Sequence, residues 1–257
     1  MPAQPANPAA NTIGLHRVMF AVDDLDDTLT RLKGSYGVES LGGIGEQKIV
    51  PDAVLVGGAA AALYAGHRDS FDHDHVLSDL SERYAEVVAA VEASEGWVTS
   101  VRASSPPLTL LDSLDGIEAG LRHLRRVRPL EVEEVDVDGH VLRVPTLPEC
   151  LRVKAYLMVQ RNQVRDYLDT VALAERLGDS VTTLASIDHY YRDRSDGTDS
   201  VLTAVVQRLS EPTPRDTRVT RQLSAYKGLG RSWHDWSVVV AACTDLADDI
   251  VDWLGAQ

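Results

Sequence analysis

The sequence predicts an α/β protein in which a half of mixed helices and strands is followed by a helical half. The apolar run Val54–Val56 ends in Gly57-Gly58, a pattern typical of a buried strand that turns sharply into a helix. Between Leu130 and Val144, apolar and acidic residues alternate around Asp138-Gly139, the turn dipeptide of a tight β-hairpin. Beyond Thr146 the patterns are helical, which places the boundary between the halves there.

Helices are predicted where apolar residues recur at helical spacing, and strands where they alternate or run between turn residues. In chain order the expected helices cover 13–32, 59–63, 80–93, 148–177, 181–191, 200–209 and 236–254. The expected strands cover 54–56, 68–76, 97–102, 130–137 and 140–144. Residues 34–45 and 106–116 are expected to form connections, and 121–127 fit either a strand or a helix. The change of phase at Glu133-Glu134 indicates a β-bulge.

The expected domain organisation is a loose N-terminal arm over 1–12, an α/β core over 13–146 and a helical domain over 147–257. The arm is rich in proline and alanine and lacks the basic and apolar segments of a signal peptide. No apolar run approaches the ~20 residues that a membrane helix needs. Cys150 and Cys243 form neither a disulfide framework nor a zinc pattern. We therefore expect a cytoplasmic protein without membrane contact.

The net charge of −14 argues against a protein that coats nucleic acid nonspecifically. Two stretches are nevertheless basic. The first contains Arg122, Arg125, Arg126 and Arg128, and the second contains Arg208, Arg215, Arg218, Arg221, Lys227 and Arg231. Each stretch fits either a solvated face or a rim that faces RNA or a triphosphate, and the sequence leaves both interpretations open.

The stretch after the two glycines predicts a metal and phosphate site. On a strand, residues two apart share a face, so Ser70, Asp72 and Asp74 are expected to point the same way. Two neighbouring carboxylates repel one another unless a cation offsets them, and hard divalent ions prefer such oxygen ligands. Because Gly57 and Gly58 let a ligand approach the backbone closely, Mg²⁺ (or Mn²⁺) and phosphate are the expected ligands.

These residues also carry a resemblance to a known family. The string Gly57-Gly58, Leu63, His67-Arg68, Ser70, Asp72 and Asp74 resembles the AbiEii/AbiGii-type nucleotidyltransferase toxins (MenT-like) of the DNA polymerase beta-like nucleotidyltransferase superfamily. A second segment continues it with Val144–Glu149, Lys154 and Arg165-Asp166-x-x-Asp169. The resemblance covers Val54–Leu77 and Thr146–Leu177. It implies a nucleotidyltransferase-like mixed sheet core with flanking helices, followed by a helical C-terminal bundle.

The resemblance further implies transfer of NMP from an NTP to an acceptor hydroxyl, most simply a tRNA 3′ end. It makes Asp72 and Asp74 the metal ligands and Lys154 the triphosphate contact, while Asp169 either orients Lys154 or acts as a base. Gly57 and Gly58 would bind phosphate through backbone N–H groups at the helix start. The resemblance also implies a toxin of a toxin–antitoxin or phage-defence system, with a cognate antitoxin as partner.

The remaining site residues have two interpretations each. Arg68 contacts nucleotide or pairs with an acidic neighbour, and Ser70 binds a phosphate oxygen or completes a turn. Arg165 shares a helix face with Lys154 if 148–177 is one helix, although Asn162-Gln163 could divide it. Glu133 is the candidate for a third metal-binding carboxylate, and a solvated strand face is the alternative.

The sequence departs from the family pattern at Ala59, where relatives place Ser or Thr, so phosphate would be held by backbone alone. Two other function classes stay open. A zinc-dependent hydrolase could use His67, His73 and His75, although the last two would face away from Asp72 and Asp74. A catalytically inactive protein that binds a partner is the other alternative.

Overall fold

The structure, a computed structural model, describes residues 44–70, 72–114, 117–124, 126, 128–137, 139–191, 200–226 and 228–257. Contacts divide the chain into two compact units, Met1–Leu41 and Gly42–Gln257. The expected N-terminal arm and the helix expected over 13–32 lie outside the described residues. The second unit contains both the sheet half and the helical half of the chain, which meet at Thr146.

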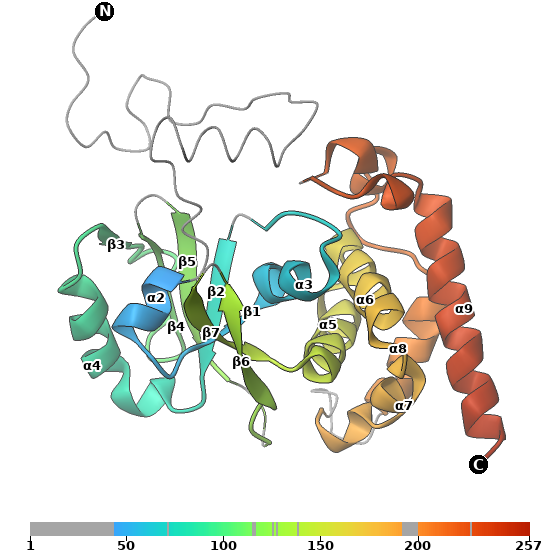
Figure 1. Cartoon of the computed structure of the whole chain (residues 1–257), viewed down its shortest axis with the longest axis horizontal. Helices are drawn as coiled ribbons and strands as arrows, with labels where there is room; N and C mark the ends of the chain where they lie inside the picture. Colours follow the sequence, from blue (N-terminus) through green and yellow to red (C-terminus); the bar gives the residue numbers. More distant parts are fainter. Residues whose placement is uncertain are drawn as a thin grey trace, which may run out of the picture. The chain divides into compact units, whose positions relative to one another are not determined.

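A five-stranded mixed sheet forms the centre of the first half (Figure 1), with strand order β1-β2-β5-β4-β3. Its strands are β1 (Val54–Val56), β2 (Asp72–Leu77), β3 (Trp97–Thr99), β4 (Thr109–Leu114) and β5 (Ile117–His123). β2 and β5 are parallel, whereas the other neighbouring strands are antiparallel. The register places Asp72 opposite Glu118 and Asp74 opposite Gly120, so β5 supplies the neighbours of the paired aspartates.

Helices cover both faces of this sheet. α2 (Ile44–Ile49) and α4 (Leu80–Glu92) lie on one side, and α3 (Gly57–Ala65) lies on the other, between the sheet and the helical half (Figure 1). Along β2 the alternation buries His73 and His75 toward α4 and leaves Asp72 and Asp74 half-buried on the α3 side. The two faces of β2 are therefore a core face and a functional face.

A separate hairpin of β6 (Val132–Val137) and β7 (His140–Pro145) packs beside β1. Its pairing is unbroken from Val132↔Pro145 to Val137↔His140, so the bulge expected at Glu133-Glu134 is wrong. Val135 and Val137 pack against the core, whereas Glu133 and Glu134 are both exposed, which interrupts the alternation without a bulge.

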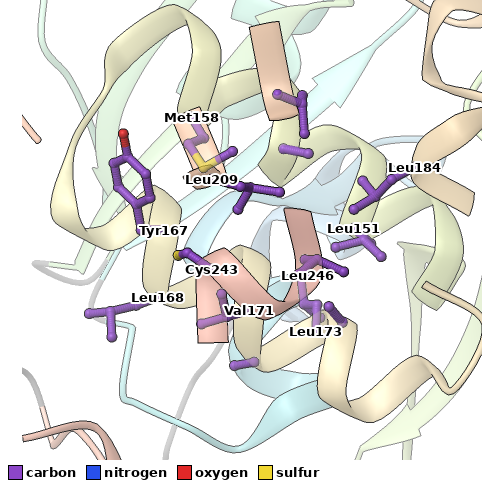
Figure 2. Close-up of a cluster of buried hydrophobic side chains, with 14 of the residues drawn as sticks. Leu151, Met158, Tyr167, Leu168, Val171, Leu173, Leu184, Leu209, Cys243 and Leu246 are labelled. Atoms are coloured by element: carbon purple, nitrogen blue, oxygen red, sulfur yellow. The ribbon is translucent and has the colours of Figure 1, made fainter. Parts of the chain in front are cut away.

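The helical half holds the larger hydrophobic core (Figure 2). Its helices are α5 (Leu147–Arg161), α6 (Val164–Leu177), α7 (Ser180–Ala185), α8 (Val201–Ser210) and α9 (Trp236–Gly255). Four 3₁₀ turns complete it, η1 (Ile187–His189), η2 (Val219–Arg221), η3 (Leu223–Ala225) and η4 (Arg231–Trp233). Leu151 and Met158 of α5 meet Leu168 of α6 and Leu246 of α9 in this core, which fixes α5 and α6 side by side.

α5 and α6 are two helices, as the alternative break at Asn162-Gln163 requires. Asn162 adopts a left-handed conformation with φ of 53°, which asparagine tolerates better than most residues. Its side chain donates to the carbonyl of Thr213 at 2.9 Å and accepts from the Tyr167 hydroxyl at 2.6 Å. Asp216 then caps α6 by accepting from the backbone N–H of Val164 at 2.8 Å.

Several expected elements differ from the structure. β2 begins at Asp72 and not at Arg68, because the segment before it bends to other partners, Asp169 and Gly230. β4 forms where a loop was expected, and its buried Asp112 explains why an apolar pattern missed it. α2 was also missed, and residues 121–123 of the ambiguous stretch form the end of β5. Among the described residues, the helices are too short or too polar to cross a membrane.

Candidate active site

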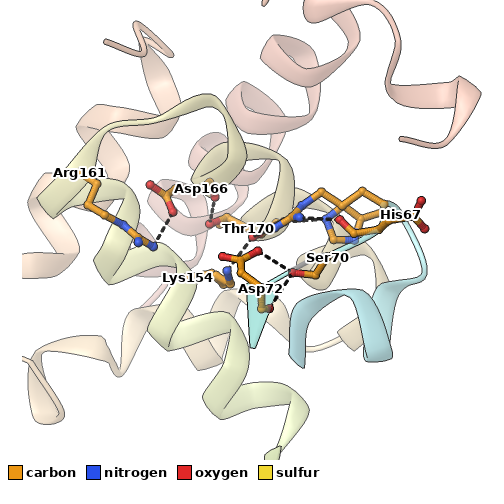
Figure 3. Close-up of polar contacts among 10 residues, drawn as sticks. His67, Ser70, Asp72, Lys154, Arg161, Asp166 and Thr170 are labelled. Atoms are coloured by element: carbon orange, nitrogen blue, oxygen red, sulfur yellow. Dashed lines mark hydrogen bonds and ion pairs between the residues drawn. The ribbon is translucent and has the colours of Figure 1, made fainter. Parts of the chain in front are cut away.

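One pocket collects most of the residues that the sequence singles out. Its lining consists of Gly57, Gly58, Arg68, Asp72, Asp74, Lys154, Arg161 and Arg165. The pocket lies where the start of α3 and the start of β2 meet the junction of α5 and α6. Figure 3 labels Lys154 of α5 and Asp72 of β2, which both line this pocket.

Gly57 and Gly58 form one wall of the pocket, and side chains at these positions would crowd the neighbouring residues. Gly57 has φ of +73°, the left-handed region that favours glycine. A Cβ on Gly58 would lie 2.6 Å from Ser70 Oγ and 2.8 Å from Arg68 Nη2. α3 has no side-chain cap at Val56, so no side chain accepts from its first N–H groups. Such groups are suited to an anion.

Asp72 and Asp74 lie on the pocket face of β2, as the strand period predicts. Ser70 precedes the strand instead of belonging to it, yet its hydroxyl lies 3.3 Å from Asp72 Oδ1. On the other side, Arg122 Nε lies 3.1 Å from Asp74 Oδ1. The aspartate pair is thus bordered by a hydroxyl at one end and a guanidinium at the other.

Asp169 is a fully buried acceptor behind the pocket. Its Oδ2 accepts from Lys154 Nζ at 2.7 Å and from Arg68 Nη2 at 2.9 Å. Its Oδ1 lies 2.7 Å from Arg68 Nε and 2.8 Å from His67 Nε2. Burial alone would raise the pKa of Asp169, but Lys154, His67 and Arg68 hold it well below its usual range. These contacts favour orienting Lys154 and Arg68 over acting as a base.

The cations of the pocket differ in how they are paired. Arg161 Nη2 lies 2.9 Å from the buried Asp166, whose pKa is raised by burial against the opposing charge of Arg161. Arg165 has no carboxylate within ion-pair distance among the described residues, and its Nε is buried without a hydrogen-bond acceptor there. An unpaired guanidinium in a pocket with three other cations suits a polyanionic ligand.

The third carboxylate is not where the sequence suggests. Glu133 accepts from the Tyr64 hydroxyl at 2.5 Å, and Glu131 pairs with Arg152 at 2.5 Å, so neither lines the pocket. Glu118 faces Asp72 across β2 and β5 and is exposed.

The aspartate pair fits a divalent ion of the Mg²⁺ type. Within the described ranges, no three carboxylate, histidine or cysteine side chains lie close enough to hold one ion. Mg²⁺ is usually held by one or two carboxylates together with substrate phosphates. Two carboxylates beside a cationic pocket match that donor set.

The histidines of the zinc alternative do not converge. His67 Nε2 contacts Asp169 behind the pocket, whereas His73 and His75 are buried on the opposite face of β2. This separation follows from the strand period, which sends alternate side chains to opposite faces. The structure therefore provides no shared zinc site for these three residues.

The two basic stretches have different structures. In the first, the side chain of Arg126 is buried and pairs with Glu149 at 2.6 Å, so neither a solvated face nor a rim fits this residue. In the second, four arginines are exposed, namely Arg215, Arg218, Arg221 and Arg231. Lys227 and Arg125 lie outside the described residues.

Two backbone hydrogen bonds hold the basic segment 208–231 beside the pocket. The N–H of Gly230 donates to the carbonyl of His67 at 2.8 Å, and the N–H of Arg215 donates to the carbonyl of Asn162 at 2.8 Å. Burial raises the pKa of Tyr226 against the opposing charges of Arg68 and Arg165, two cations of the pocket. The exposed arginines therefore belong to a segment that borders the pocket.

No family model matches the sequence. Curated proteins resemble parts of the chain. Heme uptake protein MmpL11 of Mycobacterium tuberculosis is 36% identical over 95 residues, which cover 36% of this chain and 10% of that protein. The mycolic acid-containing lipids exporter MmpL11 of Mycolicibacterium smegmatis is 34% identical over 128 residues, covering 48% of this chain and 13% of the exporter. The chain spans about a tenth of the length of these relatives.

Solved structures match a larger share of this chain than the curated proteins do. MenT4, a nucleotidyltransferase toxin from Mycobacterium tuberculosis, matches with a TM-score of 0.52 at 18% identity, over 78% of this chain and 75% of the toxin. JHP933 from Helicobacter pylori matches with a TM-score of 0.48 at 15% identity, over 86% of this chain and 96% of that protein. The likeness to MenT4 confirms the expected fold, a nucleotidyltransferase-like mixed sheet with flanking helices and a helical C-terminal part.

Proposed function

We propose that the protein is a nucleotidyltransferase, dependent on Mg²⁺ or Mn²⁺, that transfers NMP from an NTP to an acceptor hydroxyl. One observation carries the proposal. Two glycines at a helix start, two carboxylates and four cations from separate parts of the chain line a single pocket. A triphosphate needs cations and N–H donors, and a divalent ion needs the carboxylates. The fold shared with MenT4 supports the same reaction class.

Six of the eight pocket-lining residues, together with Asp169 behind them, have a chemical role in this reaction. Asp72 and Asp74 would hold the divalent ion, which lowers the pKa of the acceptor hydroxyl and offsets triphosphate charge. The N–H groups at Gly57 and Gly58 bind phosphate oxygens. Lys154 and Arg165 stabilise negative charge that develops on the triphosphate. Asp169, behind the pocket, keeps Lys154 charged and oriented.

The reaction exchanges a phosphoanhydride bond for a phosphoester bond. The acceptor oxygen forms a bond to the α-phosphorus, and the bond from that phosphorus to the bridging oxygen breaks. Pyrophosphate leaves with the electron pair, and the hydroxyl proton passes to water. The cations opposite the aspartates offset charge on the leaving group, which explains why the pocket carries more positive than negative side chains.

We further propose RNA as the acceptor, with the 3′ hydroxyl of tRNA as the preferred site. The support is electrostatic, since the basic segment 208–231 presents exposed arginines beside the pocket of an otherwise acidic protein. The same proposal assigns the chain to a toxin–antitoxin or phage-defence system with a cognate antitoxin. That assignment draws on the family resemblance and on the shared fold with a toxin.

A labelling assay tests the reaction and its acceptor together. Purified protein is incubated with Mg²⁺, each α-labelled NTP in turn and either total tRNA or bulk protein, and pyrophosphate release is followed in parallel. We expect label at tRNA 3′ ends with a preferred NTP, and loss of at least 10²-fold in Asp74→Asn. Asp248→Asn on the exposed face of α9 is the matched control and should retain activity.

Two outcomes would contradict the proposal. If no NTP gives labelled product or pyrophosphate, the transferase assignment fails. If activity survives Asp74→Asn, the pocket is not the active site. A toxin role has its own readout, because induction of the wild-type chain should arrest growth of a bacterial host while Asp74→Asn should not.

A further inference from the structure

Arg122 reaches the proposed metal site from β5. Its Nε lies 3.1 Å from Asp74 Oδ1, and the two side chains are 44% and 30% exposed. No other cation of the described residues lies within ion-pair distance of Asp74. Arg122 was grouped with Arg126 as a basic stretch, but Arg126 is buried elsewhere against Glu149. The contact with Asp74 is therefore a separate feature of the functional face of β2.

The register between β2 and β5 places Arg122 within reach of Asp74. Asp74 pairs with Gly120 and Val76 pairs with Arg122, so Arg122 lies on the face of β5 that Asp74 shares. A Cβ on Gly120 would lie 3.2 Å from Asp74 Oδ1 and 2.8 Å from Leu111 Cδ2, so a side chain there would crowd the pair. The missing side chain lets the guanidinium cross to the aspartate.

The two oxygens of Asp74 consequently have different neighbours. Oδ1 faces Gly120 and Arg122, whereas Oδ2 lies 3.4 Å from the position that a Cβ on Gly57 would occupy, at the pocket wall. A cation on Oδ1 leaves Oδ2 directed toward the pocket. The guanidinium also offsets negative charge on Asp74, whereas the charge of Asp72 interacts with that of Arg68.

We propose that Arg122 is a counter-cation built into the metal site, which weakens binding of a divalent ion in the absence of nucleotide. The positive charge of Arg122 opposes a second cation at Asp74, and the opposition is offset once a triphosphate adds its negative charges. The ion is thereby loaded together with the NTP instead of ahead of it. This inference rests on the proposed function, because it requires that Asp72 and Asp74 bind a metal.

Mn²⁺ binding to the full-length protein without nucleotide tests the inference. Electron paramagnetic resonance measures free Mn²⁺ for wild type, Arg122→Gln, Arg122→Lys and Arg102→Gln. Loss of the charge that Arg122 places on Asp74 should strengthen Mn²⁺ binding about threefold to tenfold in Arg122→Gln. Arg122→Lys keeps the charge, and Arg102 is an exposed arginine in the β3–β4 connection, so both should stay within twofold of wild type.

A second measurement uses a non-hydrolysable NTP analogue. With the analogue bound, the Mn²⁺ affinities of wild type and Arg122→Gln should converge, because the triphosphate offsets the charge that Arg122 supplied. Equal or weaker Mn²⁺ binding by Arg122→Gln without nucleotide would overturn the inference. A difference that persists unchanged with the analogue would overturn the role in loading.

Asp74→Asn separates failure of this inference from failure of the proposed function. Mn²⁺ binding that is lost in Asp74→Asn but unchanged in Arg122→Gln removes the inference and leaves the metal site intact. With the analogue bound, wild-type protein that binds Mn²⁺ no better than Asp74→Asn removes both the inference and the proposed metal site. Thermal unfolding of each variant confirms that it is folded, and the exposure of Arg122 indicates that its replacement is tolerated.

Discussion

The ammonium group of Lys154 lies 2.7 Å from Asp169 Oδ2, and this ion pair joins α5 to α6 directly behind the pocket. The Lys154 side chain is 2% exposed and that of Asp169 is 0% exposed. Asp169 also binds Arg68 and His67, so a single carboxylate orients cations from two distant parts of the chain. The pair therefore links the stability of the helical half to the geometry of the pocket.

Asp169→Asn should destabilise the protein more than Lys154→Met. The asparagine leaves Lys154 and Arg68 buried without their anion, and removing one partner of a buried pair costs about 3–5 kcal/mol. The methionine leaves Asp169 with Arg68 and His67, so we expect a loss of about 1–2 kcal/mol. Urea unfolding monitored by circular dichroism measures both. Equal losses would mean that Asp169 is not the centre of the network.

Gly58→Ala should reduce both stability and NTP binding, because the new Cβ meets Ser70 Oγ at 2.6 Å and Arg68 Nη2 at 2.8 Å. Overpacking of this kind typically costs about 1–3 kcal/mol. Ser70→Ala removes the nearer atom, so the double variant should regain part of the lost stability. Thermal unfolding and equilibrium binding of an NTP analogue report the two effects. A double variant no more stable than Gly58→Ala would contradict the geometry.

Asp112→Asn should make stability less dependent on pH. Burial, with a smaller contribution from the charge of Glu46, raises the pKa of Asp112 to about 8. The folded protein keeps this proton up to about pH 8, whereas the unfolded chain releases it near pH 4, so stability falls as pH rises between these values. The asparagine cannot ionise and should be more stable than wild type at pH 8 by on the order of 1 kcal/mol. Urea titrations at pH 5 and pH 8 measure this, and a parallel loss in both proteins would refute it.

Charge reversal in the basic segment 208–231 should weaken RNA binding and spare NTP binding. Arg218→Glu with Arg221→Glu changes two exposed side chains beside the pocket but leaves the pocket lining unaltered. We expect at least a tenfold loss of tRNA affinity in about 0.1 M salt, together with a shallower salt dependence. Arg102→Glu with Arg176→Glu is the matched control, because Arg176 lies at the opposite end of α6 from Arg165. Filter binding at several salt concentrations distinguishes them, and equal losses in both variants would rule out a specific surface.

The sequence predicts local parts of the site best. Gly57, Gly58, Asp72 and Asp74 lie within one strand–helix–strand unit, so spacing and strand period suffice to place them on one wall. The relation of Lys154 to Asp169 was also expected, although the expectation relied on the family resemblance. The geometry of this pair could not be predicted, because Asn162 divides the helix and turns α6 back on α5.

Contacts between distant segments could not be predicted. Arg68 meets Asp169 only because α3 and the following bend pack against α6, and neither spacing nor composition encodes that packing. Glu118 and Arg122 depend on the parallel pairing of β2 with β5, and the region of β5 was ambiguous between strand and helix. Glu133 was placed on the correct hairpin, but the hairpin directs it to Tyr64.

The hydrogen bond from Gly230 to the carbonyl of His67 has a consequence for biosynthesis. A nascent chain that has not yet emerged past Gly230 already carries every residue that lines the pocket, but it lacks the backbone contact that holds the bend before β2. The bend before β2 can therefore gain this contact only after Gly230 has been synthesised, later than every residue that lines the pocket.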